Sequence, residues 1–279
     1  MMAFAYDGSL NGDWVSHYAV RFAAQSPERR LQLLHVYNGH VAGEVAHGID
    51  RIAAECARLG VALDPILRAR GATSVAGCLL ALVPAGPGTM LVAGTRARPR
   101  NIAFLAGTVS AQLLAAGRFP VVAMRVVQPG VLGQPGHVLL PLSGHPRGAA
   151  FALPLLHLLG TDLLRLHVLL VREVSRLRFR LLDQAAAERL LAAGRGFLAG
   201  VEEELRRGLA PLRGAFDASA IVSDDAAREI LVFAAKLHAR LICLGASKRG
   251  LPARLVYGNP IEQVLRDAPC DVAVYRSVD

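Results

Sequence analysis

The segment Met90–Ser110, MLVAGTRARPRNIAFLAGTVS, carries the pattern that decides the fold. A short apolar run ends in Gly94, a basic loop follows, and Gly107 then opens a helical pattern. A strand that passes through glycines into a helix is the repeating unit of a parallel α/β sheet. The N–H groups at such a helix start bind anions, so the segment predicts an α/β fold with a phosphate-binding loop. Hydroxyls and positive charge would add donors, from Thr108, Ser110, Arg96, Arg98 and Arg100. The simpler interpretation is an ordinary strand–helix connection in which Thr108 is an N-cap and the arginines are solvated.

A second copy of this pattern occurs later in the chain. FPVVAMR at 119–125 precedes CDVAVYR at 270–276 by 151 residues, and Gly94 precedes Gly245 by the same interval. Earlier in each copy, AYDGS at 5–9 corresponds to PLSGH at 141–145, and LHV recurs at 34–36 and 166–168. Corresponding residues are separated by a shorter interval in these early segments than in the later ones. The second copy therefore has extra residues between them, within 174–209. The seam between the copies, QPGVLGQPG at 128–136, has the glycine and proline content of a linker. We therefore predict two domains, 1–128 and 136–279.

Each copy alternates short apolar runs with helical patterns, which predicts a five-stranded, mostly parallel sheet with helices on both faces. In the first copy the expected strands are 3–6, 31–36, 62–69, 90–93 and 120–124, and the expected helices are 13–24, 45–59, 73–82 and 108–116. In the second copy the expected strands are 138–142, 164–171, 216–221, 241–244 and 272–275. His35 and His167 recur at matching strand positions, where we expect backbone groups to satisfy them. Asp224 or Asp225 is the expected N-cap of the helix that follows.

Composition narrows the class of protein. The chain is 53% hydrophobic and 19% charged, which argues against disorder. Its net charge is +9, which base composition or an anionic partner would explain. Aromatic residues make up only 5%, so we expect no nucleic-acid binding.

The four cysteines lack metal-site spacing and are expected to be buried free thiols. The apolar stretch 151–171 contains Asp162 and Arg165 and is expected to form a helix, a turn and a strand rather than a membrane span. We expect a cytoplasmic protein.

These motifs resemble the universal stress protein family, and their repetition resembles its tandem members. Gly94, Gly107 and Thr108 match the family's nucleotide loop, with Val109 and Ser110 continuing it, whereas Ala97 replaces the middle glycine. The resemblance implies binding of ATP, with Mg²⁺ as its usual companion. It places Asp7 near the nucleoside and the end of the second strand, Val36 and Tyr37, against the adenine. The implied binding residues are Asp7, Val36, Tyr37, Gly94, Arg96, Ala97, Gly107, Thr108, Val109 and Ser110.

The second copy departs further from the family pattern. Ser143 stands where Asp7 stands, and Lys248 takes the place of the middle glycine. Gly258-Asn259-Pro260-Ile261 replaces the glycine–hydroxyl helix start, and Pro260 lacks a backbone donor. We therefore expect a weak or absent second site.

Three functions remain open at this stage. The resemblance favours a regulatory stress-response protein that binds adenine nucleotide through its first copy. A scaffold that acts through dimerisation or partner contacts is the second, motivated by Ala97. An adenylate-cleaving or adenylate-transferring enzyme is the third, but no catalytic residues or metal ligands are evident, so we expect no enzyme. The resemblance also implies that the last strands, 120–124 and 272–275, pair across a pseudo-two-fold axis, as in the family's homodimers; dimerisation of the whole chain is a further alternative.

Overall fold

The computed structural model describes residues 1–95, 104–105, 107–209, 214–246 and 260–278. The first half contains β1 (Met2–Ala5), α1 (Leu10–Gln25), β2 (Arg30–Tyr37), α2 (Gly43–Arg58), β3 (Ala62–Ala69), α3 (Val75–Leu82), β4 (Met90–Gly94), α4 (Val109–Ala116) and β5 (Val121–Arg125). The second half contains β6 (Gly136–Leu142), α5 (Gly148–Leu159), β7 (Leu163–Glu173), α6 (Arg176–Arg180), α7 (Gln184–Gly208), β8 (Ala215–Ser223), α8 (Ala226–Lys236), β9 (Leu241–Gly245), α9 (Pro260–Asp267) and β10 (Asp271–Arg276). Short 3-10 turns occur at Pro129–Val131 and Gly160–Asp162.

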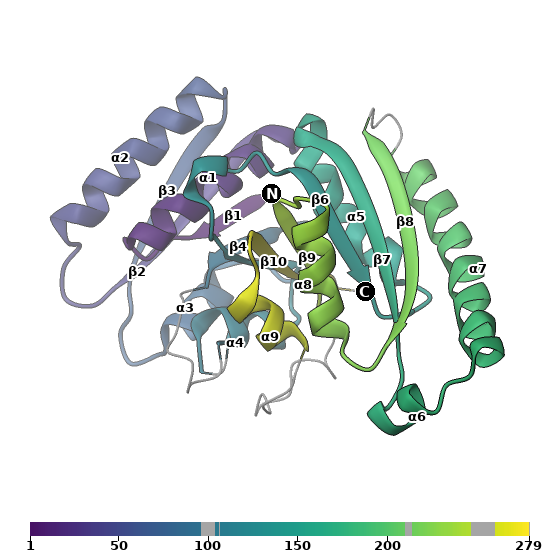
Figure 1. Cartoon of the computed structure of the whole chain (residues 1–279). Coiled ribbons are helices and arrows are strands. Elements are labelled where there is room, and N and C mark those ends of the chain that lie inside the picture. The colour runs from purple at the N-terminus through teal and green to yellow at the C-terminus, as the bar shows by residue number, and fades with distance from the viewer. Residues whose placement is uncertain (96–103, 106, 210–213, 247–259, 279) are drawn as a thin grey trace.

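The strands form one continuous sheet, in the order β3-β2-β1-β4-β5-β10-β9-β6-β7-β8 (Figure 1). Read outward from the centre, the second half repeats the strand order of the first. Strands within each half pair in parallel, whereas β5 and β10 pair antiparallel, with Ala123 opposite Val274. The predicted α/β fold with a mostly parallel sheet is confirmed, and the two last strands pair as expected. The extra residues of the second half form α6 and the 25-residue helix α7.

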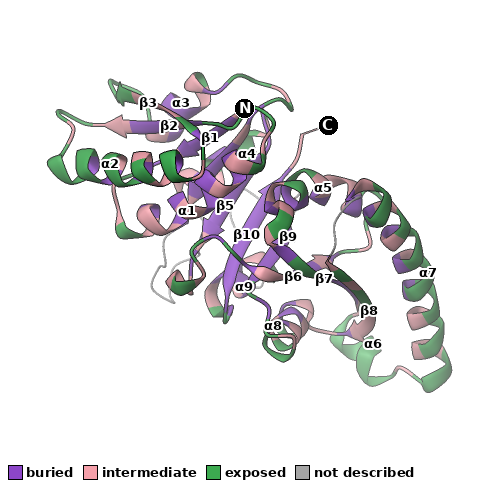
Figure 2. Cartoon of the chain, turned by 90° about the horizontal axis from the view of Figure 1, so that it is seen from above, coloured by how far each residue is buried: buried purple, intermediate pink, exposed green. Residues whose placement is uncertain are grey.

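Helices cover both faces of the sheet. On one face α1 contacts α2 and α5, and α5 contacts α7; on the other, α3 contacts α4 and α8 contacts α9. Two apolar cores result, one under each helix layer. The outer strands β3 and β8 are largely exposed or half-buried (Figure 2), so the expectation that every strand is covered on both faces is wrong for the sheet edges. An edge strand has a neighbour on one side only and less helix above it.

Several local predictions are also confirmed. All four cysteines are free and buried, and burial raises the pKa of Cys56 to about 11 and that of Cys270 to about 12. Such thiols stay protonated and unreactive near neutral pH. Asp225 is the N-cap of α8, through its bond with the N–H of Arg228. The stretch 151–171 is a helix, a turn and a strand, and no helix among the described residues is long and apolar enough to cross a bilayer.

Candidate functional site

The candidate site lies where the first-half strands β1 and β4 end. These strands are parallel neighbours, and Ala5 pairs with Ala93, so the residues that follow them leave the sheet at the same edge. Asp7 follows β1 and is exposed; its Oδ1 accepts hydrogen bonds from the N–H and the hydroxyl of Ser9, at 3.0 and 2.6 Å. Ser9 in turn is the N-cap of α1. The carboxylate of Asp7 is therefore part of the turn that starts α1 and also faces solvent.

The position of Asp7 depends on the residue before it. The N–H of Tyr6 donates to the carbonyl of Leu34 at 2.9 Å, and the imidazole Nδ1 of His35 donates to the carbonyl of Tyr6 at 2.9 Å. His35 is buried, so this bond fixes the backbone directly in front of Asp7. The expectation that the backbone satisfies His35 is confirmed. In the second half His167 bonds the hydroxyl of Ser219 instead, at 3.1 Å, and burial lowers its pKa.

The two residues expected at the adenine lie on opposite faces of β2. Neighbouring residues in a strand point to opposite sides. Val36 packs with the core on the α3 and α4 face, whereas Tyr37 stacks on His35, with ring centroids 6.4 Å apart, on the α1 and α2 face. Only Val36 therefore shares a face with the start of α4.

Gly94 ends β4 and has a packing reason to be glycine. A Cβ there would lie 2.7 Å from the Nδ2 of Asn11 in α1. The absence of a side chain at Gly94 therefore lets α1 approach the end of β4. Asn11 is a neighbour of the site that no sequence pattern indicated. Arg96 and Ala97, both predicted site residues, lie outside the described residues.

The start of α4 lies against the end of β4, because the hydroxyl of Ser110 donates to the carbonyl of Gly94 at 2.7 Å. Gly107 has a φ of +70° and open space where a Cβ would stand. Thr108 is the N-cap: its hydroxyl accepts from the N–H of Ala111 at 3.0 Å and donates to the carbonyl of Leu105 at 2.7 Å. Both hydroxyls thus donate to backbone carbonyls in this conformation, and their role as donors to a phosphate stays a prediction.

Among the described residues at the start of α4, the main-chain N–H groups are the donors that remain for an anion. The first N–H groups of a helix have no acceptor within the helix, and Thr108 satisfies that of Ala111 alone. The N–H groups of Val109 and Ser110 therefore stay at the positive end of the α4 dipole, beside the half-exposed Thr108 and the exposed Gly107. This end of α4 can hold a phosphate oxygen through main-chain donors.

A carboxylate from the other half reaches this loop. Glu262, in α9, is buried and accepts hydrogen bonds from the N–H groups of Phe104 and Leu105, the second at 2.8 Å. The guanidinium of Arg125 lies 5.3 Å from the ring centre of Phe104. Sequence reasoning missed Glu262, because the matching position in the first half is Ala111 and the contact joins segments 157 residues apart.

The second half differs at the corresponding edge. Ser143 is exposed, and Pro260 opens α9 with no N–H to offer. Lys248, Gly258 and Asn259 lie outside the described residues. A cavity of about 360 Å³ lies elsewhere at this edge, between the ends of β7 and β8 and the starts of α8 and α9. Its lining mixes Arg176 and Arg228 with Glu173, Asp224 and Asp225, which gives it no dominant charge. Among the described residues no cluster of metal-ligating side chains occurs.

Comparison with known proteins decides the family. The profile of the universal stress protein family matches residues 136–276, which is half of the chain. The chain belongs to the universal stress protein family. The match covers the second half; the first half shares its α/β architecture and strand order. No match is found among curated proteins.

Solved structures share the fold along nearly the whole chain. A universal stress protein from Archaeoglobus fulgidus is 18% identical, with a TM-score of 0.61, over 98% of this chain and 97% of its own. A functionally unknown protein from Pseudomonas aeruginosa is 16% identical, with a TM-score of 0.59, over 99% and 92%. The cytoplasmic domain of a prokaryotic cation chloride cotransporter is 12% identical, with a TM-score of 0.62, over 99% and 95%. At these identities the likeness establishes the fold and leaves ligands open.

Proposed function

We propose that this stress-response protein binds an adenine nucleotide, ATP with Mg²⁺, at the first-half edge formed by Asp7 and the start of α4. The observation that carries the proposal is the bond from Ser110 to Gly94, which places the N-terminus of α4 at the end of β4, next to the strand that Asp7 follows. The main-chain donors of Val109 and Ser110 suit a phosphate, and the Asp7 carboxylate suits a nucleoside hydroxyl. Nucleotide binding would then regulate the protein without chemistry on the nucleotide.

Asymmetry between the halves is part of the proposal. The second half offers Ser143 in place of a carboxylate and Pro260 in place of an N–H donor. Binding a triphosphate is costly unless several donors converge on it. We therefore assign binding to the first half and no or weak binding to the second.

The matched variants Asp7→Asn and Ser143→Ala test this assignment. Both positions are exposed and follow equivalent strands, so neither change removes a core contact. We expect Asp7→Asn to weaken ATP binding about tenfold, since a hydrogen bond to a charged group contributes roughly 1.5–3 kcal/mol. Ser143→Ala should leave affinity within about twofold of wild type, an effect below 0.5 kcal/mol. Equilibrium dialysis with labelled ATP measures both, and the reverse ranking would move the site to the second half.

A scaffold that binds no nucleotide is the second candidate, and two observations favour it. The hydroxyls of Thr108 and Ser110 are bonded internally, and Glu262 brings negative charge to the loop before Gly107. In this reading the pairing of β5 with β10 imitates, within one chain, a dimer of two single-domain proteins. Absence of ATP binding at millimolar concentration, by the same dialysis, would favour the scaffold.

A further inference from the structure

The segment 175–181 of the second half is a protruding tip with an unusual surface. Every residue in it is exposed. Three large apolar side chains are exposed to solvent within five consecutive positions: Leu177, Phe179 and Leu181. Leu177 is 71% exposed and Leu181 is 75% exposed. The segment contains α6 and has no counterpart in the first half, where β2 leads to α2 without it (Figure 1).

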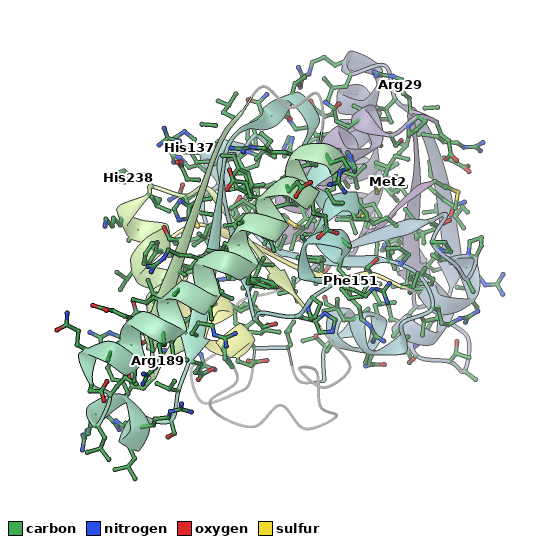
Figure 3. The ribbon with its side chains drawn as sticks, turned by 90° about the vertical axis from the view of Figure 1, so that its right-hand side faces the viewer. Met2, Arg29, His137, Phe151, Arg189 and His238 are labelled. Carbon is green, nitrogen blue, oxygen red and sulfur yellow. The ribbon has the colours of Figure 1, made fainter. Side chains whose placement is uncertain are left out.

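The order of residues places a pair of leucines between arginines, with Phe179 on the opposite side of the turn. Leu177 and Leu181 are four residues apart and lie on the same side of the helical turn. Arg178 and Arg180 lie to either side of this leucine pair, as the helical rotation per residue requires. Arg176 is 3.8 Å from Asp224, whereas among the described residues no carboxylate lies within ion-pair distance of Arg178 or Arg180. The exposed Arg189, near the start of α7, lies toward the same end of the molecule (Figure 3).

We propose that this tip docks the protein on the surface of an anionic lipid bilayer. Leucines flanked by arginines fit such a surface, because the apolar pair enters the acyl boundary while the guanidiniums bind headgroup phosphates. The charge argues against a second copy of the chain as occupant, since a symmetric contact would set arginines against arginines. The tip projects beyond the start of α7, which suits a broad, flat partner (Figure 1).

Co-sedimentation of the full-length chain with vesicles tests the proposal. We expect binding to vesicles of phosphatidylcholine with phosphatidylserine, little binding to phosphatidylcholine alone, and loss of binding at high NaCl because salt screens the arginines. The double variant Leu177→Ser/Leu181→Ser should bind at least tenfold more weakly. A tenfold loss is on the order of the free energy gained when a single leucine side chain is buried. Arg178→Gln/Arg180→Gln should lose about twenty-five-fold, roughly fivefold for each arginine.

The double variant Leu10→Ser/Leu164→Ser is the matched control. These leucines are 64% and 62% exposed, yet they lie apart from each other, at the start of α1 and in β7. Its vesicle binding should equal that of the wild type. Equal binding to neutral vesicles, no binding to anionic ones, or an equal loss in the control would overturn the proposal. A change in self-association or in binding to an acidic protein, with vesicle binding unaffected by the tip variants, would also overturn it and assign the tip to a protein interface.

Discussion

The Asp271→Ala variant is expected to unfold with a free energy about 4 kcal/mol below that of the wild type. Asp271 begins β10 and is fully buried. Its Oδ2 accepts from the hydroxyl of Tyr18 at 2.7 Å, and its Oδ1 accepts from the N–H groups of Val127 and Gln128 at 2.7 and 2.9 Å. Alanine would leave all three donors without their acceptor, and each buried unsatisfied group costs about 1–3 kcal/mol. Urea unfolding followed by circular dichroism measures the change.

Asp271 joins three parts of the chain, because Tyr18 belongs to α1, Val127 precedes the linker and Gln128 begins it. Burial raises the pKa of its carboxyl, while its hydrogen bonds with Gln128, Tyr18 and Val127 act in the opposite direction. Tyr18→Phe is the control, since it removes one of the three bonds and should cost about 1.5 kcal/mol. If Asp271→Ala destabilises no more than Tyr18→Phe, the two linker bonds contribute nothing, and this account of the seam is wrong.

The Arg276→Ala variant has the second largest expected effect, a loss of about 3 kcal/mol in the free energy of unfolding. Arg276 ends β10, is buried, and donates from Nη1 to the carbonyls of Leu114 and Ala115, the second at 2.9 Å. These carbonyls belong to the last turn of α4 in the other half, where a cation is favoured by the helix dipole. Alanine removes two charge-assisted bonds and the guanidinium that fills the space beside Gly117.

The repeat supplies a matched control at Arg125. This residue ends β5, and its Nη1 donates to the carbonyl of Leu265 in α9, so each half extends an arginine to the last helix of the other. Burial lowers the pKa of Arg125, which is half-buried rather than buried. With one carbonyl in place of two, Arg125→Ala should cost about 1.5 kcal/mol. Thermal and urea unfolding of both variants measure the difference, and an equal or larger loss in Arg125→Ala would contradict the ranking.

Much of the fold could be predicted from local pattern. Short apolar runs between helical patterns located each strand of the sheet. FPVVAMR and CDVAVYR are separated by the same interval as Gly94 and Gly245, which indicated that the two last strands are equivalent. Apolar periodicity and turn residues act over a few positions, so they can be read directly. The exposed edges β3 and β8 were harder, because burial depends on which strand ends the sheet.

The candidate site was less predictable, because its contacts join distant segments. Thr108 and Ser110 match the family's loop, yet their hydroxyls bond to Leu105 and Gly94. A hydroxyl's partner depends on the turn that brings an acceptor to it, which residue type alone does not specify. Glu262 was missed for the same reason: a single buried carboxylate in α9 has no local signature, and its partners lie in the other half. We expected the backbone to satisfy His35. Its partner, the carbonyl of Tyr6 directly before Asp7, could not be predicted, because it depends on how β1 and β2 are aligned in the sheet.

Calorimetric titration of the wild-type chain with ATP and Mg²⁺ tests the central claim most directly, because it counts sites as well as measuring affinity. The account predicts saturable binding of one nucleotide per chain, since the described residues of the second half offer Ser143 and Pro260 where the first half has Asp7 and a main-chain donor at the start of α4. Two nucleotides per chain would contradict the asymmetry between the halves. No heat of binding at millimolar ATP would contradict nucleotide binding itself.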